Sequence, residues 1–223
     1  MTSERGARRT QDERSSAMRE RLLDATVDCL VEYGYAGTTV TRIAERAGVT
    51  RGAQVHHYRT KDDLVMAAVT HLAGQSAEFG WTQIAGIADS ADPVGDLLDI
   101  LWEMHKGPTF TATVELWVAA RTDDELRRHV AAVEPVLLAI LRDEADRNGV
   151  ANVTDDPAAA ALLEAVFTAM DAIRGLLISA WHLPVRQRNA RWRRARERLR
   201  VIFPPTDEVR TLIAGATIGA PGG

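Results

Sequence analysis

The chain has 223 residues, of which 46% are apolar, 26% are charged and only 5% are aromatic. A chain of this length and apolar content can fill a real core, so it does not belong to the disordered class. The net charge of −4 is an average of two different parts, because residues 1–61 carry 11 basic and 8 acidic side chains whereas residues 62–223 carry 16 and 23.

The composition favours helices, because Ala, Leu, Arg and Glu dominate and lose little side-chain freedom in a helix. We find no strand signal and therefore expect an all-α fold. Cys29 is the single cysteine and has no intrachain disulfide partner, and the polar N-terminus does not resemble a secretory signal. No apolar run approaches the 18 residues of a membrane span. We expect a cytoplasmic protein without a membrane partner.

The first 15 residues are charged and carry no helical period, which predicts a flexible arm. From Ser16 onward, apolar and small residues recur at steps of three and four, and Gly34 provides a stop signal. This first predicted helix has one face made of Leu22, Ala25, Thr26, Cys29, Leu30 and Tyr33.

Two short helices are expected next, separated by a tight turn. Thr39 is a suitable N-cap for VTRIAERA, which ends at Gly48. Thr50 is a suitable N-cap for RGAQVHHY, and Thr60 precedes a further helix, KDDLVMAAVTHL. The small Ala44 and the turn glycine allow the two helices to approach closely. The stretch from Thr39 to Lys61 therefore has the pattern of a helix-turn-helix.

The second of these helices carries side chains suited to reading DNA. Arg and Gln have bidentate geometry for guanine and adenine, and we expect four residues to point outward: Arg51, Gln54, His56 and His57. Between Arg42 and Lys61 the local net charge is +4, which suits a phosphate backbone. The adjacent histidines point to different helix faces and have no ligand partner at i+4, so a metal site is not expected.

The run TTVTRIAERAGVTRGAQVHHYRTKDDLV resembles the TetR family of bacterial regulators, and with the preceding helix the resemblance covers residues 16–72. It implies that Thr39 and Lys61 anchor phosphates, that Thr41 and Arg42 lie beside the DNA backbone or groove, and that residues 50–57 form the recognition helix. The expected DNA-binding residues are Thr39, Thr41, Arg42, Thr50, Arg51, Gly52, Gln54, Val55, His56, His57, Tyr58 and Lys61.

The sequence departs from the family pattern within the recognition helix. Val55 stands where the family usually has tyrosine, Gln54 where it is usually apolar, and Tyr58 where it is usually phenylalanine. An expected hydroxyl contact is therefore lost, and the operator preference cannot be transferred from other members. We expect Gln54 to substitute as a base reader.

Beyond residue 80 the sequence predicts helices at 93–105, 109–120, 123–148, 156–182 and 186–203, with a kink at Pro135. We divide the chain into an arm (1–15), a three-helix DNA-binding domain (16–62), a larger helical domain for effector binding and dimerisation (63–205) and a loosely held tail (206–223).

The last two predicted helices carry apolar seams. In the resembled family such helices form a four-helix interface with a second subunit, whereas burial within one subunit is the alternative. The seam residues are Leu162, Val166, Ala169, Ile173, Leu177, Trp192, Ala195, Leu199 and Ile202. Eight arginines in the last helix predict a solvated face or one that meets an acidic patch.

Apolar residues with a few polar ones among them suggest a pocket for a largely apolar effector, although a simple core has the same composition. The candidates are Trp102, His105, Phe110, Trp117, Phe167, Met170, Arg174 and Trp181. Arg174 would pair with an acid such as Glu115 or with an anionic group of the ligand.

These observations predict a regulator that binds a palindromic operator as a homodimer and is released by a small molecule. An activator, or a regulator without a small-molecule effector, would have the same sequence features. An architectural DNA-binding protein should lack the acidic body. An all-helical enzyme is disfavoured because no catalytic constellation, phosphate-binding loop or metal cluster is visible, and no cofactor is expected.

Overall fold

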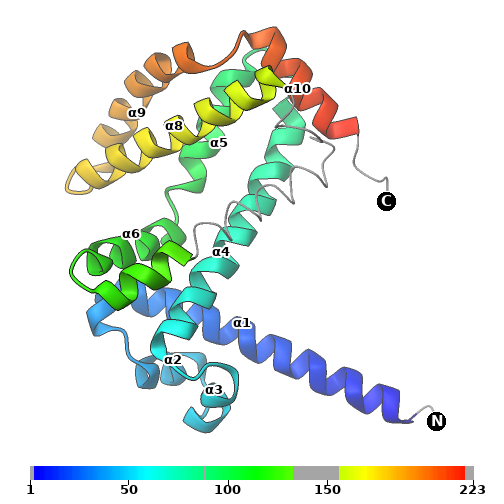
Figure 1. Ribbon diagram of the computed structural model, residues 1–223, viewed down its shortest axis with the longest axis vertical. Coiled ribbons are helices and arrows are strands. Elements are labelled where there is room, and N and C mark those ends of the chain that lie inside the picture. Colours follow the sequence, from blue (N-terminus) through cyan, green and yellow to red (C-terminus); the bar gives the residue numbers. More distant parts are fainter. Residues whose placement is uncertain (1–2, 88, 133–155, 219–223) are drawn as a thin grey trace. The chain divides into compact units, whose positions relative to one another are not determined.

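The computed structural model describes residues 3–87, 89–132 and 156–218, and these residues are helical with no strand among them (Figure 1). The helices are α1 (Ser3–Gly37), α2 (Val40–Ala47), α3 (Arg51–His57), α4 (Lys61–Ile84), α5 (Pro93–Met104), α6 (Pro108–Ala120), α8 (Pro157–Ser179), α9 (Val185–Leu199) and α10 (Thr206–Ile218). Short 3₁₀ turns follow α4 and α9, at Ala85–Ile87 and Arg200–Ile202. The all-α prediction is confirmed.

The chain divides into two compact units, one with residues 1–73 and 108–137 and the other with residues 74–107 and 138–223. In the first unit, α1, α2, α4 and α6 share a core whose fully buried members include Leu22, Leu30, Ile43 and Leu64. Leu116 of α6 is buried in the same core. The first unit is therefore larger than the expected three-helix domain, because α6 packs against α1.

The glycine stop of the first helix is present. Gly34 has φ 65° and ψ 177°, a backbone conformation that is nearly restricted to glycine, so the regular helix is interrupted there. The predicted face of this helix is buried, except that Tyr33 is substantially exposed. The helix begins at Ser3, within the segment expected to be a flexible arm.

In the second unit, α5, α8 and α9 pack against one another around a common core. The indole rings of Trp102 on α5 and Trp192 on α9 are stacked, with centroids 4.8 Å apart and an interplanar angle of 2°. Leu98 of α5 and Ile173 of α8 are fully buried. This packing fixes the register of α9 against α5.

The end of the chain differs from the expectation of a loosely held tail. Residues 206–218 form α10, whose Val209 and Ile213 are buried in the second unit. The Arg210 guanidinium also donates to the Ser90 carbonyl oxygen at 2.7 Å. An amphipathic face and a specific polar contact thus attach this segment to its unit.

Three other predicted helices are close to the observed ones, with small shifts at their ends: α5, α6 and α8. The segment predicted as 123–148 is helical over residues 124–132, and the remainder, including the kink expected at Pro135, lies outside the described residues. None of the described helices is long and apolar enough to span a membrane.

Candidate DNA-binding and effector sites

The helix-turn-helix is built as its sequence predicts. Thr39 has an extended backbone and its hydroxyl accepts a hydrogen bond from the Arg42 amide at 3.3 Å, which caps α2. Gly48 follows α2 with φ 65° and ψ 37°, the left-handed conformation that favours glycine at a helix end. Ile43, Ala44 and Ala47 are buried, so α2 presents its apolar face to the unit's core.

The start of α3 is open to solvent. Thr50 accepts the first backbone hydrogen bond of the helix, from the Gln54 amide at 3.1 Å, and therefore occupies the predicted N-cap position. Arg51, Gly52 and His56 are exposed, and a Cβ atom at Gly52 would meet nothing within 4 Å. The side chain of Val55 lies outside the described residues. A ligand can approach the first turn of α3 closely.

Two further members of the predicted recognition helix are half-buried, His57 and Tyr58. Burial and the neighbouring His56 hold the pKa of His57 below its usual value, and burial raises the pKa of Tyr58. The described residues contain no group of His, Cys, Asp or Glu side chains placed to hold a metal ion.

Gln54 is not a base reader in this structure, contrary to our prediction. Its side chain is fully buried, and its Nε2 donates to the Tyr58 carbonyl oxygen at 2.7 Å, so it points into the unit. Its Oε1 is buried without a hydrogen-bond partner among the described residues. The family's apolar preference at this position was the better guide, because the side chain faces the core.

Two arginines of α2 are held against α1. The Arg42 guanidinium donates to the Gly37 carbonyl oxygen and lies 4.7 Å from the centre of the Tyr33 ring. Arg46 pairs with Glu32 and, at 3.5 Å, with Asp28. Arg42 and Thr41 are exposed, as a DNA-contacting role requires. Arg46 instead acts as a tie between α1 and α2.

Lys61, the predicted phosphate anchor, is also engaged within the unit. Its Nζ donates to the Tyr35 carbonyl oxygen at 2.7 Å and lies 3.6 Å from the centre of the Tyr35 ring. Partial burial lowers the pKa of Lys61. The Tyr35 hydroxyl donates to Asp62 at 2.5 Å, and burial together with this bond raises the pKa of Tyr35. Sequence reasoning missed this Tyr35 cluster, for which the only signal was an aromatic residue beside the helix stop.

The predicted effector residues fall in both units. Phe110 and Trp117 belong to the first unit, where their rings meet edge to face with centroids 6.4 Å apart. The other six belong to the second unit. Trp102 is buried in the stack with Trp192, so it belongs to the core and not to a pocket. Phe167, Met170 and Arg174 are half-buried, and Trp181 is 44% exposed.

His105 and Arg174 contact each other in the second unit. The Arg174 Nε donates to the His105 Nε2 at 3.3 Å, and the Arg174 Nη1 pairs with Asp171 at 3.1 Å. Asp171 therefore takes the place of Glu115, the partner that we had suggested. Burial, with a smaller contribution from Arg174, lowers the pKa of His105 to about 4.

Part of the predicted dimer seam is used within the subunit. Ala169, Ile173, Leu177 and Trp192 are buried in the core of the second unit, so these four assignments are corrected to intramolecular packing. Leu162, Val166, Ala195 and Leu199 are half-buried, and Ile202 is exposed. Helical periodicity had located an apolar face but could not tell which molecule covers it.

Arg196 of α9 and Arg200 of the 3₁₀ turn that follows it form a partly exposed ion-pair network with α5 and its N-cap, Asp92. The Arg200 guanidinium binds both carboxylate oxygens of Asp92, at 2.6 and 2.7 Å, and Arg196 bridges Asp92 and Asp99. The hydrogen bonds from Arg200 lower the pKa of Asp92 to about 2. The Trp192 indole nitrogen also donates to Asp99 at 2.9 Å.

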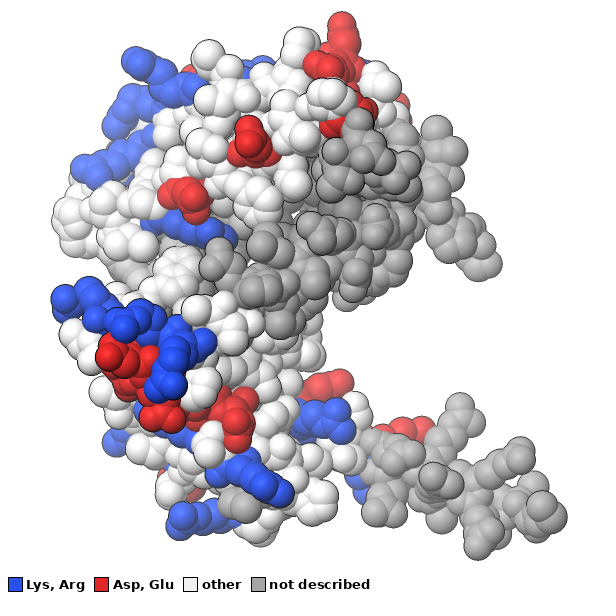
Figure 2. Space-filling view, viewed as in Figure 1, with Lys and Arg blue, Asp and Glu red and all other residues white. Residues whose placement is uncertain are grey.

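Five of the remaining arginines of α9 are exposed, which fits both of our alternatives, a solvated face and a face that meets an acidic patch. Figure 2 shows Lys and Arg side chains gathered over this helix. The exposed members are Arg186, Arg191, Arg193, Arg194 and Arg198.

Comparison with known proteins agrees with this architecture. The family model described as "Bacterial regulatory proteins, tetR family" matches residues 22–68. An uncharacterised HTH-type transcriptional regulator of Mycobacterium tuberculosis is 32% identical over 172 residues, which are 76% of this chain and 88% of the relative. The HTH-type transcriptional regulator CymR of Pseudomonas putida is 35% identical over 55% of this chain and 61% of its own length.

Solved structures resemble the chain over most of its length. A TetR family member from Streptomyces coelicolor A3 has a TM-score of 0.54 at 25% identity, covering 84% of this chain and 99% of its own. The multidrug binding protein EbrR complexed with imidazole has a TM-score of 0.52 at 26% identity, covering 84% and 95%. The relatives are named as transcriptional regulators and not as enzymes. The chain belongs to the TetR family of DNA-binding transcriptional regulators.

Proposed function

We propose that this chain is a repressor that binds a palindromic operator as a homodimer and is released by a small molecule bound in its second unit. The observation that carries the proposal is that the first turn of α3 is exposed to solvent, whereas the residues that attach α2 and α3 to the first unit are buried. Arg51 and Gly52 are exposed there, while Ile43, Ala44 and Gln54 hold the motif against the core. Exposed recognition side chains on a rigid base are what base reading in a major groove requires.

The side chains divide into base-reading and phosphate-binding groups. Arg51 has the bidentate geometry for a guanine, and His56, near the other end of α3, is also exposed. Thr39, Thr41 and Arg42 lie at the start of α2, where hydroxyl and guanidinium groups suit phosphate oxygens. In this assignment the first group determines sequence preference, whereas the second determines overall affinity.

The dimer is proposed to use the outward faces of α8 and α9. Val201 and Ile202, in the 3₁₀ turn that follows α9, are apolar residues that are 84% and 43% exposed. A two-fold dimer would place two α3 helices about 34–36 Å apart, one turn of DNA, which matches a palindromic site.

Release by a small molecule is supported by EbrR, which has been crystallised with imidazole and with ethidium. In the present chain, the half-buried residues Phe167, Met170 and Arg174 of the second unit form the proposed binding face. A ligand that binds one conformation of the protein more tightly than the DNA-bound one lowers operator affinity by that difference in binding free energy.

The test is a titration of the purified chain against a duplex from its own promoter region and against a scrambled duplex, at fixed near-physiological salt. Arg51→Ala should weaken binding to the first duplex by about 5- to 150-fold and reduce discrimination. Arg121→Ala, just beyond α6, removes the same charge from an exposed site outside the motif and outside α8 and α9, and it should change the affinity little. Equal, weak binding of both duplexes would contradict the proposal.

A further inference from the structure

The second unit places an arginine in the middle of an apolar face. On α8, Phe167, Met170 and Arg174 follow one another at steps of three and four residues, so they lie along one side of the helix. All three are half-buried. Trp181 lies in the turn just beyond the end of α8, seven residues after Arg174, and is 44% exposed. We call these four residues the α8 flank.

A buried histidine orients the arginine. His105 is 7% exposed, and its Nδ1 lies 2.8 Å from the Leu101 carbonyl oxygen. Because a carbonyl oxygen only accepts, Nδ1 carries the proton and Nε2 accepts from the Nε of Arg174. The histidine is therefore neutral and fixes the guanidinium without neutralising its charge. We assign it a positioning role.

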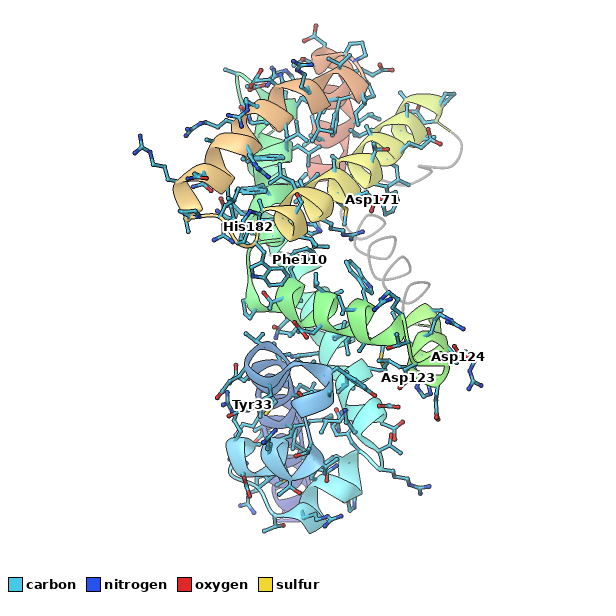
Figure 3. The ribbon with its side chains drawn as sticks, turned by 90° about the vertical axis from the view of Figure 1, so that its left-hand side faces the viewer. Tyr33, Phe110, Asp123, Asp124, Asp171 and His182 are labelled. Atoms are coloured by element: carbon cyan, nitrogen blue, oxygen red, sulfur yellow. The ribbon has the colours of Figure 1, made fainter. Side chains whose placement is uncertain are left out.

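The carboxylate that pairs with Arg174 is easily exchanged. The Asp171 side chain, labelled on α8 in Figure 3, is 78% exposed, and it approaches the Nη1 of Arg174 at 3.1 Å from one turn earlier. Exposed ion pairs contribute little to stability, because water solvates both partners well. Another anion that also places apolar surface on the α8 flank can therefore displace Asp171 from the guanidinium.

We propose that the effector of this protein is an apolar organic monoanion whose carboxylate binds Arg174 in place of Asp171 and whose apolar body lies against Phe167, Met170 and Trp181. This inference rests on the proposed function, since it specifies the chemical class of the ligand that releases the DNA. One fixed guanidinium beside a neutral histidine matches a single negative charge, and a planar carboxylate suits its geometry.

The experiment measures binding to the full chain without DNA at pH 7.5, by titration calorimetry. The probes are 2-naphthoate and 2-naphthamide, which share an apolar body and differ in charge. The carboxylate should bind at least about tenfold more tightly, as expected of a charge-assisted hydrogen bond. Arg174→Gln should remove this preference and Arg174→Lys should retain part of it. Asp171→Asn should tighten naphthoate binding, because the competing carboxylate is gone.

Arg194→Gln is the matched control, since it removes one exposed arginine of the same unit and should leave both affinities unchanged. Equal affinities for the two probes overturn the proposal, as does a preference that survives in Arg174→Gln. Absence of saturable naphthoate binding up to about 1 mM also overturns it. Thermal melting of each variant identifies any that fails to fold, and Arg174→Lys provides a second, more conservative substitution.

The operator titration separates this inference from the proposed function. A chain that binds its operator selectively but shows no charge preference refutes the anionic effector alone. A chain that binds naphthoate through Arg174 but does not discriminate between duplexes refutes the repressor alone. Release of the operator by naphthoate, lost in Arg174→Gln, would support both.

Discussion

Replacing Gln54 by leucine distinguishes a structural role for this residue from a role in reading DNA. The Gln54 side chain is fully buried, and its Oε1 has no hydrogen-bond partner among the described residues. A buried, unsatisfied polar atom costs about 1–3 kcal/mol. The hydrogen bond from Nε2 to the Tyr58 carbonyl oxygen, which leucine loses, contributes about 1 kcal/mol.

The two contributions together predict that Gln54→Leu leaves the free energy of unfolding unchanged or raises it by up to about 2 kcal/mol. Operator affinity should change by less than about twofold, because the side chain does not reach the surface. Gln54→Ala is the control for lost volume, and it should be destabilising because it leaves a cavity where a fully buried side chain stood.

The assay is urea unfolding at fixed protein concentration, combined with the duplex titration described above. Fixed concentration matters because the proposed dimerisation would make the apparent stability concentration-dependent. A variant Gln54→Leu that folds normally but loses operator affinity tenfold or more would refute the structural role and restore our original prediction of a base reader.

Three further predictions concern stability and assembly. Asp92→Asn keeps the helix cap but loses the ion pairs with Arg196 and Arg200, so it should lower the free energy of unfolding by about 1 kcal/mol at pH 7, after allowance for solvent exposure. Asp92→Ala also loses the cap and should lower it by about twice as much, as measured by urea unfolding. Equal losses in the two variants would contradict a capping role. The pKa of His105 is lowered to about 4 in the folded chain, so its contribution to the free energy of unfolding is fully present above pH 6.5 and is lost as the pH drops toward 4. The free energy of unfolding should therefore fall by about 2 kcal/mol between pH 7.5 and 5.0, and His105→Gln should flatten this part of the stability profile. Val201→Asp together with Ile202→Asp should convert the proposed dimer to a monomer in analytical ultracentrifugation and weaken operator binding, and a dimer that persists would place the interface elsewhere.

The local features of the DNA-binding motif could be read from the sequence. Thr39 could be identified as an N-cap because its hydroxyl accepts a hydrogen bond from an otherwise unpaired amide at the start of α2. Gly48 could be identified as the turn glycine because the backbone has a positive φ there, which favours glycine. The helical period likewise located the apolar face of α1, since a period of 3.6 residues depends only on neighbouring positions. Such features need no knowledge of distant residues.

The direction of single side chains on short helices was decided by tertiary packing. The helix α3 has seven residues, fewer than two full turns, so its sequence does not define which side faces the core, and Gln54 was assigned to the wrong side. Lys61 illustrates the same point, because its contact with Tyr35 joins residues 26 positions apart.

The partner of an apolar or charged face was also decided only by tertiary structure. Periodicity showed that Trp192 lies on an apolar seam, but its stacking on Trp102 shows that the seam is covered within the subunit. The sequence identified Arg174 as an unusual charge on an apolar helix. Its pair with Asp171 is local to α8, whereas its contact with His105, at the end of α5, joins residues 69 positions apart and required the packing of α5 against α8. The sequence thus determined the helices, the motif and the family, because these follow from local pattern. Which helix face packs against which depended on the three-dimensional packing, because the hydrophobic effect favours burial of apolar surface but does not depend on which apolar surface covers it.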